Sequence, residues 1–334
     1  MQGILLVNLG TPDSTSIPDV RKYLDEFLMD EYVIDLPRWA RALLVRGIVL
    51  RTRPPKTAAA YQSIWYDSGS PLLVNTQALA DKLKSEPIEI GMRYGNPSIK
   101  AGLDSLINRY PEITSIKIIP LYPQYAMATT KTVEVAVKKV IDQYYPDLAI
   151  SYVPPFYNQP DYIAALAYSI QAHLTPTTEF TLFSYHGIPE RHVKKTDPTK
   201  THCLKVKDCC NTQNSSAQAV CYPYQAKKTT ALVAQRLGLG PDQWGVSFQS
   251  RFGLDKWLSP ATDSEIKRLA QSGIKHLAIC CPAFISDCLE TLEEIGEEGR
   301  EIFLENGGQT YTLIPCLNDD DRLAQCLLRL AKTP

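Results

Sequence analysis

The chain has 334 residues, of which 44% are hydrophobic and 21% are charged. This length allows two ordinary domains, and the hydrophobic content excludes a disordered chain. The formal net charge is -1, so the chain has no general basic field for nucleic acid or anionic lipid. We therefore expect a globular protein that does not bind nucleic acid and that meets any acidic partner through local groups.

The first residues lack the basic region and the cleavage site of a signal peptide. No apolar stretch is long enough to span a membrane, so we expect a cytoplasmic protein. The chain contains nine cysteines, an odd number. In a reducing compartment, clustered thiols favour metal or redox chemistry over disulfides.

Eight apolar runs separated by amphipathic stretches recur along the chain. Runs that are apolar without alternation predict parallel strands covered on both faces. We therefore expect an α/β fold with two similar halves, joined near residues 145 to 160. The runs are Gly3 to Gly10, Pro87 to Tyr94, Ser115 to Pro123, Leu148 to Pro155, Phe180 to Gly187, Trp244 to Arg251, His276 to Phe284 and Thr310 to Leu317.

The segment from Pro37 to Arg51 combines apolar, aromatic and basic residues. This mixture suits a large flat ligand with carboxylates, or a membrane surface. An ordinary amphipathic helix with arginines on its solvated face explains the same composition, and composition alone favours that interpretation.

His186 ends the fifth apolar run, directly before Gly187. The run predicts a buried strand, and open α/β sheets bind their ligands at the carboxyl ends of strands. A single histidine at a strand end is commonly a hydrogen-bonded structural residue. The turn that follows His186 instead predicts a side chain presented on the ligand side, where an imidazole can accept protons or bind a metal.

Glu290 follows the seventh apolar run at the start of an acidic helix, so it would reach the same sheet edge as His186. Asp287 and Glu290 also fit a capping box, which is a purely structural role. Glu294 continues an acidic stripe along this helix, and such a stripe is commonly only a solvated face. If Glu290 is a ligand or a base, the acids behind it could carry a cation inward or protons outward.

Four cysteines fall within nineteen residues of a polar stretch that cannot form its own core. Four thiolates in such a loop suggest a metal site that staples it. Zinc is the alternative, although the adjacent Cys209 and Cys210 depart from the usual zinc-ribbon spacing and favour an iron–sulfur cluster. Some of the four could also be free thiols. The four residues are Cys203, Cys209, Cys210 and Cys221.

These motifs together resemble the ferrochelatase family over nearly the whole chain. The matching segments occur in the family's order, which makes the resemblance specific. They are Leu6 to Pro12, Met92 to Gly95, Pro120 to Tyr125, Ser184 to Pro189, Asp255 to Pro260 and Pro282 to Leu292.

The resemblance implies two Rossmann-like domains with parallel sheets and a porphyrin cleft between them. We expect domains at residues 1–150 and 151–310, with a cysteine insertion at 199–221. A final strand and helix at 311–334 would pack back on the first domain. The implied activity is a lyase reaction, the insertion of Fe(II) into protoporphyrin IX as the last step of haem synthesis.

The resemblance also implies roles for individual residues. His186 and Glu290 would handle the iron, with Asp287 and Glu294 behind them. The porphyrin would contact Tyr125, Trp257 and Phe284, and its propionates would meet Arg53, or less securely Arg51, Lys56 and Ser70.

Two features depart from the common family pattern. Cys288 stands where many members have histidine, which puts a relay through that imidazole in doubt. We also expect no C-terminal extension of the kind in which some members carry [2Fe-2S] ligands, and the chain instead resembles a bacterial subgroup with an internal four-cysteine insertion.

Several alternatives stay open at this point. The enzyme could load another metal, or act on coproporphyrin. A noncatalytic porphyrin or metal carrier is a different class of function. The sequence leaves open the oligomeric state and a peripheral contact with the inner membrane.

Overall fold

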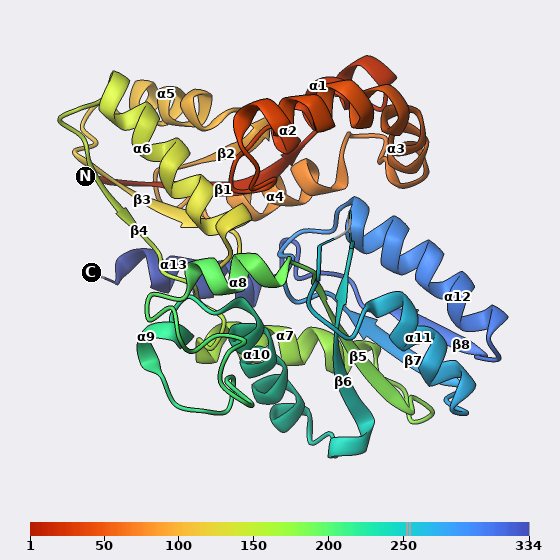
Figure 1. The fold of residues 1–334 in the computed structure, drawn as a ribbon. Helices are drawn as coiled ribbons and strands as arrows, with labels where there is room; N and C mark the ends of the chain where they lie inside the picture. Colours follow the sequence, from red (N-terminus) through yellow and green to blue (C-terminus); the bar gives the residue numbers. More distant parts are fainter. Residues whose placement is uncertain (252, 254, 334) are drawn as a thin grey trace. The chain divides into compact units, whose positions relative to one another are not determined.

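A computed structural model describes residues 1–251, 253 and 255–333 of the chain (Figure 1). The chain divides into two compact units. The first comprises residues 1–122, 127–154 and 318–334, and the second comprises residues 123–126 and 155–317. Each unit is a parallel sheet covered by helices, which confirms the predicted α/β class.

The first unit contains a four-stranded parallel sheet in the order β2-β1-β3-β4. Leu5 and Val7 point to one face of β1 and pack against helices α5 and α6. Helices α4 and α13 pack against strands of the same sheet. The strands are β1 (Gln2–Thr11), β2 (Ile88–Gly95), β3 (Ser115–Pro120) and β4 (Ala149–Tyr152).

The helices of the first unit include two π-helical turns, labelled η1 and η2. The last helix, α13, is anchored to the sheet because Lys117 of β3 donates to the Thr333 carbonyl at 2.8 Å. The helical segments are α1 (Ile17–Leu28), α2 (Arg38–Leu44), η1 (Val45–Val49), α3 (Leu50–Ile64), α4 (Pro71–Lys82), α5 (Ile99–Arg109), η2 (Met127–Lys131), α6 (Thr132–Tyr144) and α13 (Asp321–Lys332).

The second unit repeats this plan with a parallel sheet in the order β6-β5-β7-β8. The two sheets therefore share one strand order, as expected from the two similar halves of the sequence. All eight predicted strands are present, although several are shorter than the apolar runs. The strands are β5 (Phe180–His186), β6 (Trp244–Gln249), β7 (His276–Cys280) and β8 (Thr310–Leu313).

Helices cover both faces of the second sheet (Figure 1). Leu182 and Ile279 pack with α11 and α12 on one face. On the other face, the Tyr185 hydroxyl contacts the Thr230 hydroxyl of α10 at 2.8 Å. The helical segments are α7 (Pro160–His173), α8 (Glu190–Thr196), α9 (Ser215–Gln218), α10 (Tyr222–Leu237), η3 (Pro241–Gln243), α11 (Thr262–Gln271), η4 (Glu290–Glu298) and α12 (Gly299–Glu305).

The strand order creates a topological switch point between β5 and β7. The chain leaves β5 toward β6 on one side and then returns to β7 on the other side. In open α/β sheets the carboxyl ends of the two strands at such a point flank the ligand site. His186 is the last residue of β5, and the segment after β7 leads to Glu290.

The segment from α2 to α3 is helical but not an ordinary amphipathic helix. Trp39, Leu43 and Ile48 have 74%, 66% and 58% of their surface exposed. Arg41 is instead buried, and it donates to the Ile34 carbonyl at 3.1 Å. Main-chain carbonyls hold Arg41 inside, while Arg38, Arg46 and Arg51 are exposed, as the interpretation favoured by composition expects of arginines.

Among the residues described, none of the helices combines the length and the apolar character that crossing a bilayer requires.

Candidate active site

His186 is half-buried at the carboxyl end of β5. Its Nδ1 lies 2.6 Å from the Gly187 carbonyl oxygen, which can only accept a hydrogen bond. The proton of a neutral ring is therefore on Nδ1, and the Nε2 lone pair is left to bind a proton or a metal. The ring of Phe284 lies beside the imidazole, with 6.3 Å between ring centroids.

The turn after His186 is fixed by close backbone packing. Gly187 donates its N–H to the Gln249 carbonyl at 2.7 Å. A Cβ at position 187 would lie 2.7 Å from that carbonyl oxygen and 3.2 Å from the Trp257 ring. Trp257 also forms a β-bridge with Pro189. The turn therefore brings the predicted contact residue Trp257 against the residue that follows His186.

Glu290 begins η4, which has the wide turns of a π-helix. The sequence predicted an acidic helix here without specifying its type, and the structure has a π-helix that continues into α12. A single period of apolar positions does not distinguish an α-helix from a π-helix, and π-turns are frequent at functional sites. Gln249 at the end of β6 donates from Nε2 to the Glu290 carbonyl at 2.9 Å. This bond fixes the start of η4 against the sheet.

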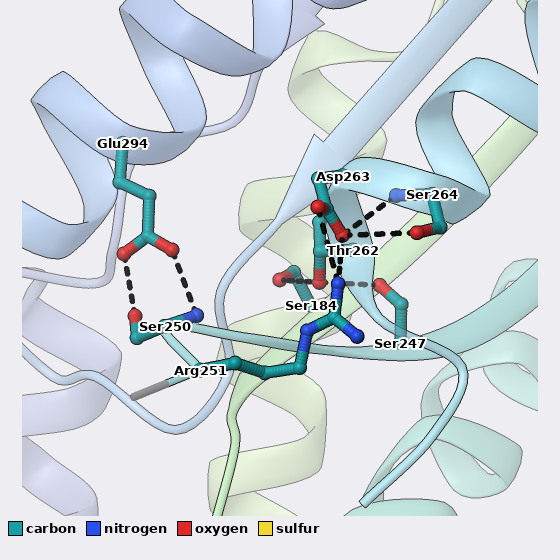
Figure 2. A network of polar contacts seen from close by, with 8 residues as sticks. All are labelled: Ser184, Ser247, Ser250, Arg251, Thr262, Asp263, Ser264 and Glu294. Carbon is teal, nitrogen blue, oxygen red and sulfur yellow. Dashed lines mark hydrogen bonds and ion pairs between the residues drawn. The ribbon is translucent and has the colours of Figure 1, made fainter. Parts of the chain in front are cut away.

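Glu294 lies one turn further along η4 and is bound by the turn after β6 (Figure 2). Its Oε1 accepts from the Ser250 N–H at 2.7 Å, and its Oε2 accepts from the Ser250 hydroxyl. Burial raises the pKa of Glu294 and neighbouring Glu290 adds to the rise, while Ser250 and His186 oppose it. His186, Glu290 and Glu294 are therefore close enough to act on one another electrostatically.

Figure 2 also shows how neighbouring polar side chains secure this turn. Arg251 donates to both carboxylate oxygens of Asp263, at 3.1 and 3.2 Å. Thr262 donates to the Ser247 hydroxyl at 2.9 Å. Ser250 has a φ of 63°, a left-handed backbone conformation that is uncommon for a residue other than glycine. The surrounding bonds hold Ser250 in that conformation, which aims its N–H and hydroxyl at Glu294.

Asp287 and Cys288 are both buried between β7 and η4. Asp287 Oδ1 accepts from the Thr291 hydroxyl at 3.0 Å and from the Cys316 N–H at 3.2 Å. Burial raises the pKa of the Cys288 thiol, and the Glu290 carboxylate, with which it hydrogen-bonds, raises it further. The residue that replaces the frequent histidine is thus a protonated thiol beside Glu290.

Gln249 and Ser250 were not identified as functional residues from the sequence. Both stand at the end of the apolar run from Trp244 to Arg251, where the pattern turns polar. The same signal identified His186 at the end of its strand. Applied to β6, it would have pointed to these two residues.

The other predicted contact residues are distributed over both units. Arg53 lies exposed near the start of α3, and Ser70 is the buried N-cap residue of α4, both in the first unit. Tyr125 belongs to the second unit, and its backbone N–H donates to Gln225 Oε1 at 2.7 Å. Arg51 and Lys56 are exposed on α3.

The four clustered cysteines are brought together in the second unit. Cys221 hydrogen-bonds with Cys203 and with Cys210, and Cys210 also hydrogen-bonds with Cys209. The cysteines are not joined in disulfides, and only Cys210 is more than slightly exposed. Across residues 1–251, 253 and 255–333, no three or more His, Cys, Asp or Glu side chains are arranged to hold a metal ion.

Comparison with known proteins decides the family. The model of the ferrochelatase family matches residues 1–333. The chain belongs to the ferrochelatase family. It is 47% identical to a ferrochelatase of Pseudomonas fluorescens, over 98% of this chain and 97% of the relative. It is 48% identical to a ferrochelatase of Stutzerimonas stutzeri, with the same coverage of both chains.

Solved structures confirm the predicted chelatase-like fold. SirB from Bacillus subtilis, solved with Fe3+, matches with a TM-score of 0.54 and 14% identity, over 99% of this chain and 96% of SirB. The sirohydrochlorin chelatase SirB of subspecies spizizenii, in complex with cobalt, matches with a TM-score of 0.53 and 11% identity, over 99% and 94%. The predicted enzyme class, a lyase that acts as a metal chelatase in haem synthesis, is confirmed by family membership.

Proposed function

We propose that His186 and Glu290 carry out the insertion of Fe(II) into protoporphyrin IX. The observation that carries this proposal is the contact of 2.6 Å between His186 Nδ1 and the Gly187 carbonyl oxygen. The Nε2 lone pair of His186 is left available at a switch point, and the half-buried acid Glu294 is close enough to be influenced by the charges of both His186 and Glu290. An imidazole with a free lone pair can accept a proton or contact Fe(II) at neutral pH.

Metallation exchanges two pyrrole N–H protons of the porphyrin for one Fe(II) ion, so charge is conserved. His186 Nε2 accepts the pyrrole protons one at a time as general base. Glu290 contacts the incoming iron or orients the charged imidazole. Glu294 has a raised pKa, so it can accept a proton from this pair and release it to solvent.

We infer that Asp287 stabilises the start of η4, where Glu290 lies. Its bonds to Thr291 and Cys316 connect the start of η4 to the segment after β8. This buried anchoring suits a residue that positions Glu290.

The porphyrin ring would pack against Tyr125, Trp257 and Phe284. Phe284 lies beside His186, and Trp257 packs on the turn that follows it. Walls of this kind can hold the macrocycle distorted and so expose pyrrole lone pairs. Arg53 and Ser70 are proposed to bind the propionates, with Arg51 and Lys56 as further candidates, because a guanidinium fork suits carboxylate oxygens.

An anaerobic metallation assay tests the proposed function. Purified protein is mixed with Fe(II) and either protoporphyrin or coproporphyrin, and the absorption spectrum is followed. We expect turnover to protohaem with protoporphyrin. A binding spectrum without turnover would support the carrier alternative, and preferred turnover of coproporphyrin or of another metal would replace the proposed substrate.

We further propose that Cys203, Cys209, Cys210 and Cys221 bind a [2Fe-2S] cluster. What supports the proposal is the type and number of donors, since four neighbouring thiols are joined by hydrogen bonds and are largely shielded from solvent. The backbone N–H of Leu204 also donates to Cys209 Sγ at 3.4 Å, as amides do around cluster sulfurs. A bound cluster would supply one-electron redox chemistry and cross-link the segment.

The cluster is tested by colour and metal content. We expect visible absorbance and bound iron in the purified protein, and the loss of both in Cys210→Ser. Cys326→Ala, in the buried face of α13, serves as control and should retain the colour. A colourless protein with stoichiometric zinc would refute the cluster.

The exposed apolar patch formed by Trp39, Leu43 and Ile48 is proposed to contact a membrane surface. Trp side chains favour the interface, and exposed Arg38 and Arg51 on the same helical segment would attract anionic lipid. We expect Trp39→Ser to weaken co-sedimentation with vesicles that contain phosphatidylglycerol. Unchanged sedimentation would contradict this contact.

A further inference from the structure

Gln225 connects two parts of the second unit through one side chain. It is fully buried near the start of α10, four residues after Cys221. Its Nε2 donates to the carbonyls of Gln218 and Ala219, at 3.2 and 2.9 Å. Its Oε1 accepts from the Tyr125 backbone N–H at 2.7 Å. The side chain thus bridges the end of the four-cysteine segment and the segment that carries Tyr125.

The partners of Gln225 fix the orientation of its amide. The Tyr125 N–H can only donate, and the two carbonyls can only accept. If the amide were reversed, its NH₂ group would face the Tyr125 N–H, and its oxygen would face the carbonyl oxygens of Gln218 and Ala219. Neither contact could be a hydrogen bond. One orientation of the amide therefore satisfies all three bonds.

A neighbouring contact holds the same segment without reaching the cysteines. Gln124 donates from Nε2 to the Thr229 hydroxyl, one turn further along α10, at 3.1 Å. Both residues are buried. Gln124 therefore anchors the segment to α10 directly. The Tyr125 backbone is linked to Gln218 and Ala219 through the side chain of Gln225.

We propose that Gln225 is a positioning residue that makes the placement of Tyr125 depend on the folded state of the four-cysteine segment. If the four thiols are no longer held together, the carbonyls of Gln218 and Ala219 lose their fixed positions. Gln225 then loses two of its three partners, and its bond to Tyr125 weakens. The inference rests on the proposed function, in which Tyr125 contacts porphyrin and the cysteines hold a cluster.

The test combines substitutions at both ends of this connection. Gln225→Met keeps the length of the side chain but removes all three bonds. Gln225→Glu keeps an acceptor for the Tyr125 N–H and removes both donors. Gln235→Met, at an exposed position of the same helix, is the matched control. Each is made alone and with Cys210→Ser, and hydrogen exchange of the Tyr125 amide is measured on the full chain.

We expect Cys210→Ser to speed exchange of the Tyr125 amide about tenfold in the parent protein and in Gln235→Met, since one buried hydrogen bond is weakened. Gln225→Met should speed exchange by a similar factor, and the double variant should add nothing further. Gln225→Glu should exchange more slowly than Gln225→Met and should not respond to Cys210→Ser.

Two results would overturn the inference. One is exchange of the Tyr125 amide that does not respond to Cys210→Ser in the parent protein. The other is a double variant in which the two effects multiply, because independent sites add in free energy. If Gln225→Met fails to fold, the effect of Cys210→Ser on exchange in the parent and in Gln225→Glu still tests the inference. A protein that inserts no iron but shows the expected exchange pattern would contradict the proposed function alone.

Discussion

At the scale of single residues, the chemistry available at the site depends on which side-chain atoms already form hydrogen bonds. The Gly187 carbonyl occupies Nδ1 of His186, and Ser250 occupies both oxygens of Glu294. Gln249 holds Glu290 only through its backbone carbonyl, and the Glu290 carboxylate hydrogen-bonds with the Cys288 thiol. His186 therefore keeps Nε2 for reaction, while the carboxylates of Glu290 and Glu294 already accept hydrogen bonds.

The raised pKa of Glu294 gives a prediction with a definite sign. The folded protein binds this proton more tightly than the unfolded chain, so the stabilisation is present below the usual pKa of about 4.5 and is lost as the pH rises through the raised value. Glu294→Gln lacks this titration. We expect the free energy of unfolding of Glu294→Gln, relative to the parent, to increase as the pH rises above the usual glutamate pKa.

Chemical denaturation at several pH values measures this difference. Glu297→Gln, at an exposed position of η4, is the control and should show no comparable trend. A difference for Glu294→Gln that stays constant over the whole range would show that the carboxyl titrates normally.

At the scale of elements, the turn between β5 and α8 is the tightest part of the site. Gly187→Ala would place a Cβ 2.7 Å from the Gln249 carbonyl oxygen. We expect this substitution to lower the free energy of unfolding by about 1–3 kcal/mol, because backbone must move to relieve the contact. Iron insertion should fall as well, since the same movement displaces His186.

Gly47→Ala is the matched control for the turn. A Cβ at Gly47 would meet only the Leu43 side chain, at an ordinary 3.6 Å. In this helical position alanine should be neutral or should stabilise by about 0.5–1 kcal/mol. Equal thermal stability of Gly187→Ala and the parent would contradict the described packing.

Asp197 organises the four-cysteine segment. Its carboxylate accepts from the N–H groups of Thr199, His202 and Cys203, each at 2.9 Å. Burial alone would raise the pKa of Asp197, but hydrogen bonds from Thr199, Cys203 and His202 outweigh it and hold the pKa well below its usual value. The carboxylate is therefore ionised at neutral pH.

Asp197→Asn would turn an amide N–H₂ toward backbone donors. We expect a loss of about 1–3 kcal/mol in the free energy of unfolding at neutral pH. The difference from the parent should shrink as the pH falls below the usual aspartate pKa of about 3.9, since the parent then loses the same stabilisation. Urea denaturation of both proteins at two pH values measures this difference in unfolding free energy. A difference that does not change with pH would contradict the role given to the Asp197 charge.

The sequence predicted the elements well and the supports of the site poorly. Continuous apolar runs identified all eight strands, because a strand that is buried on both faces has apolar residues at successive positions. The sequence also predicted His186 and Glu290 as site residues, since His186 ends such a run and Glu290 follows one. It missed Gln249 and Ser250, because their role comes from β6 lying next to β5 in the sheet. It also missed the π-helical form of η4, since the π-helix buries a similar apolar pattern.

At the scale of the whole chain, the residues with proposed roles are distributed over two units whose sheets have the same strand order. The second unit carries His186, Glu290, Glu294 and the four cysteines. The first carries Arg53, Ser70 and the exposed apolar patch. The contribution of the second unit can therefore be tested separately, by substitutions that leave the first unit unchanged.

The most direct test of the account is anaerobic Fe(II) insertion into protoporphyrin by His186→Ala. We expect kcat to fall by about 100-fold or more, with porphyrin binding changed only a few-fold, because a general base contributes about 10²–10⁴. His173→Ala on α7 is the control and should retain parent activity. Full activity in His186→Ala would contradict the assignment of His186 as the proton acceptor.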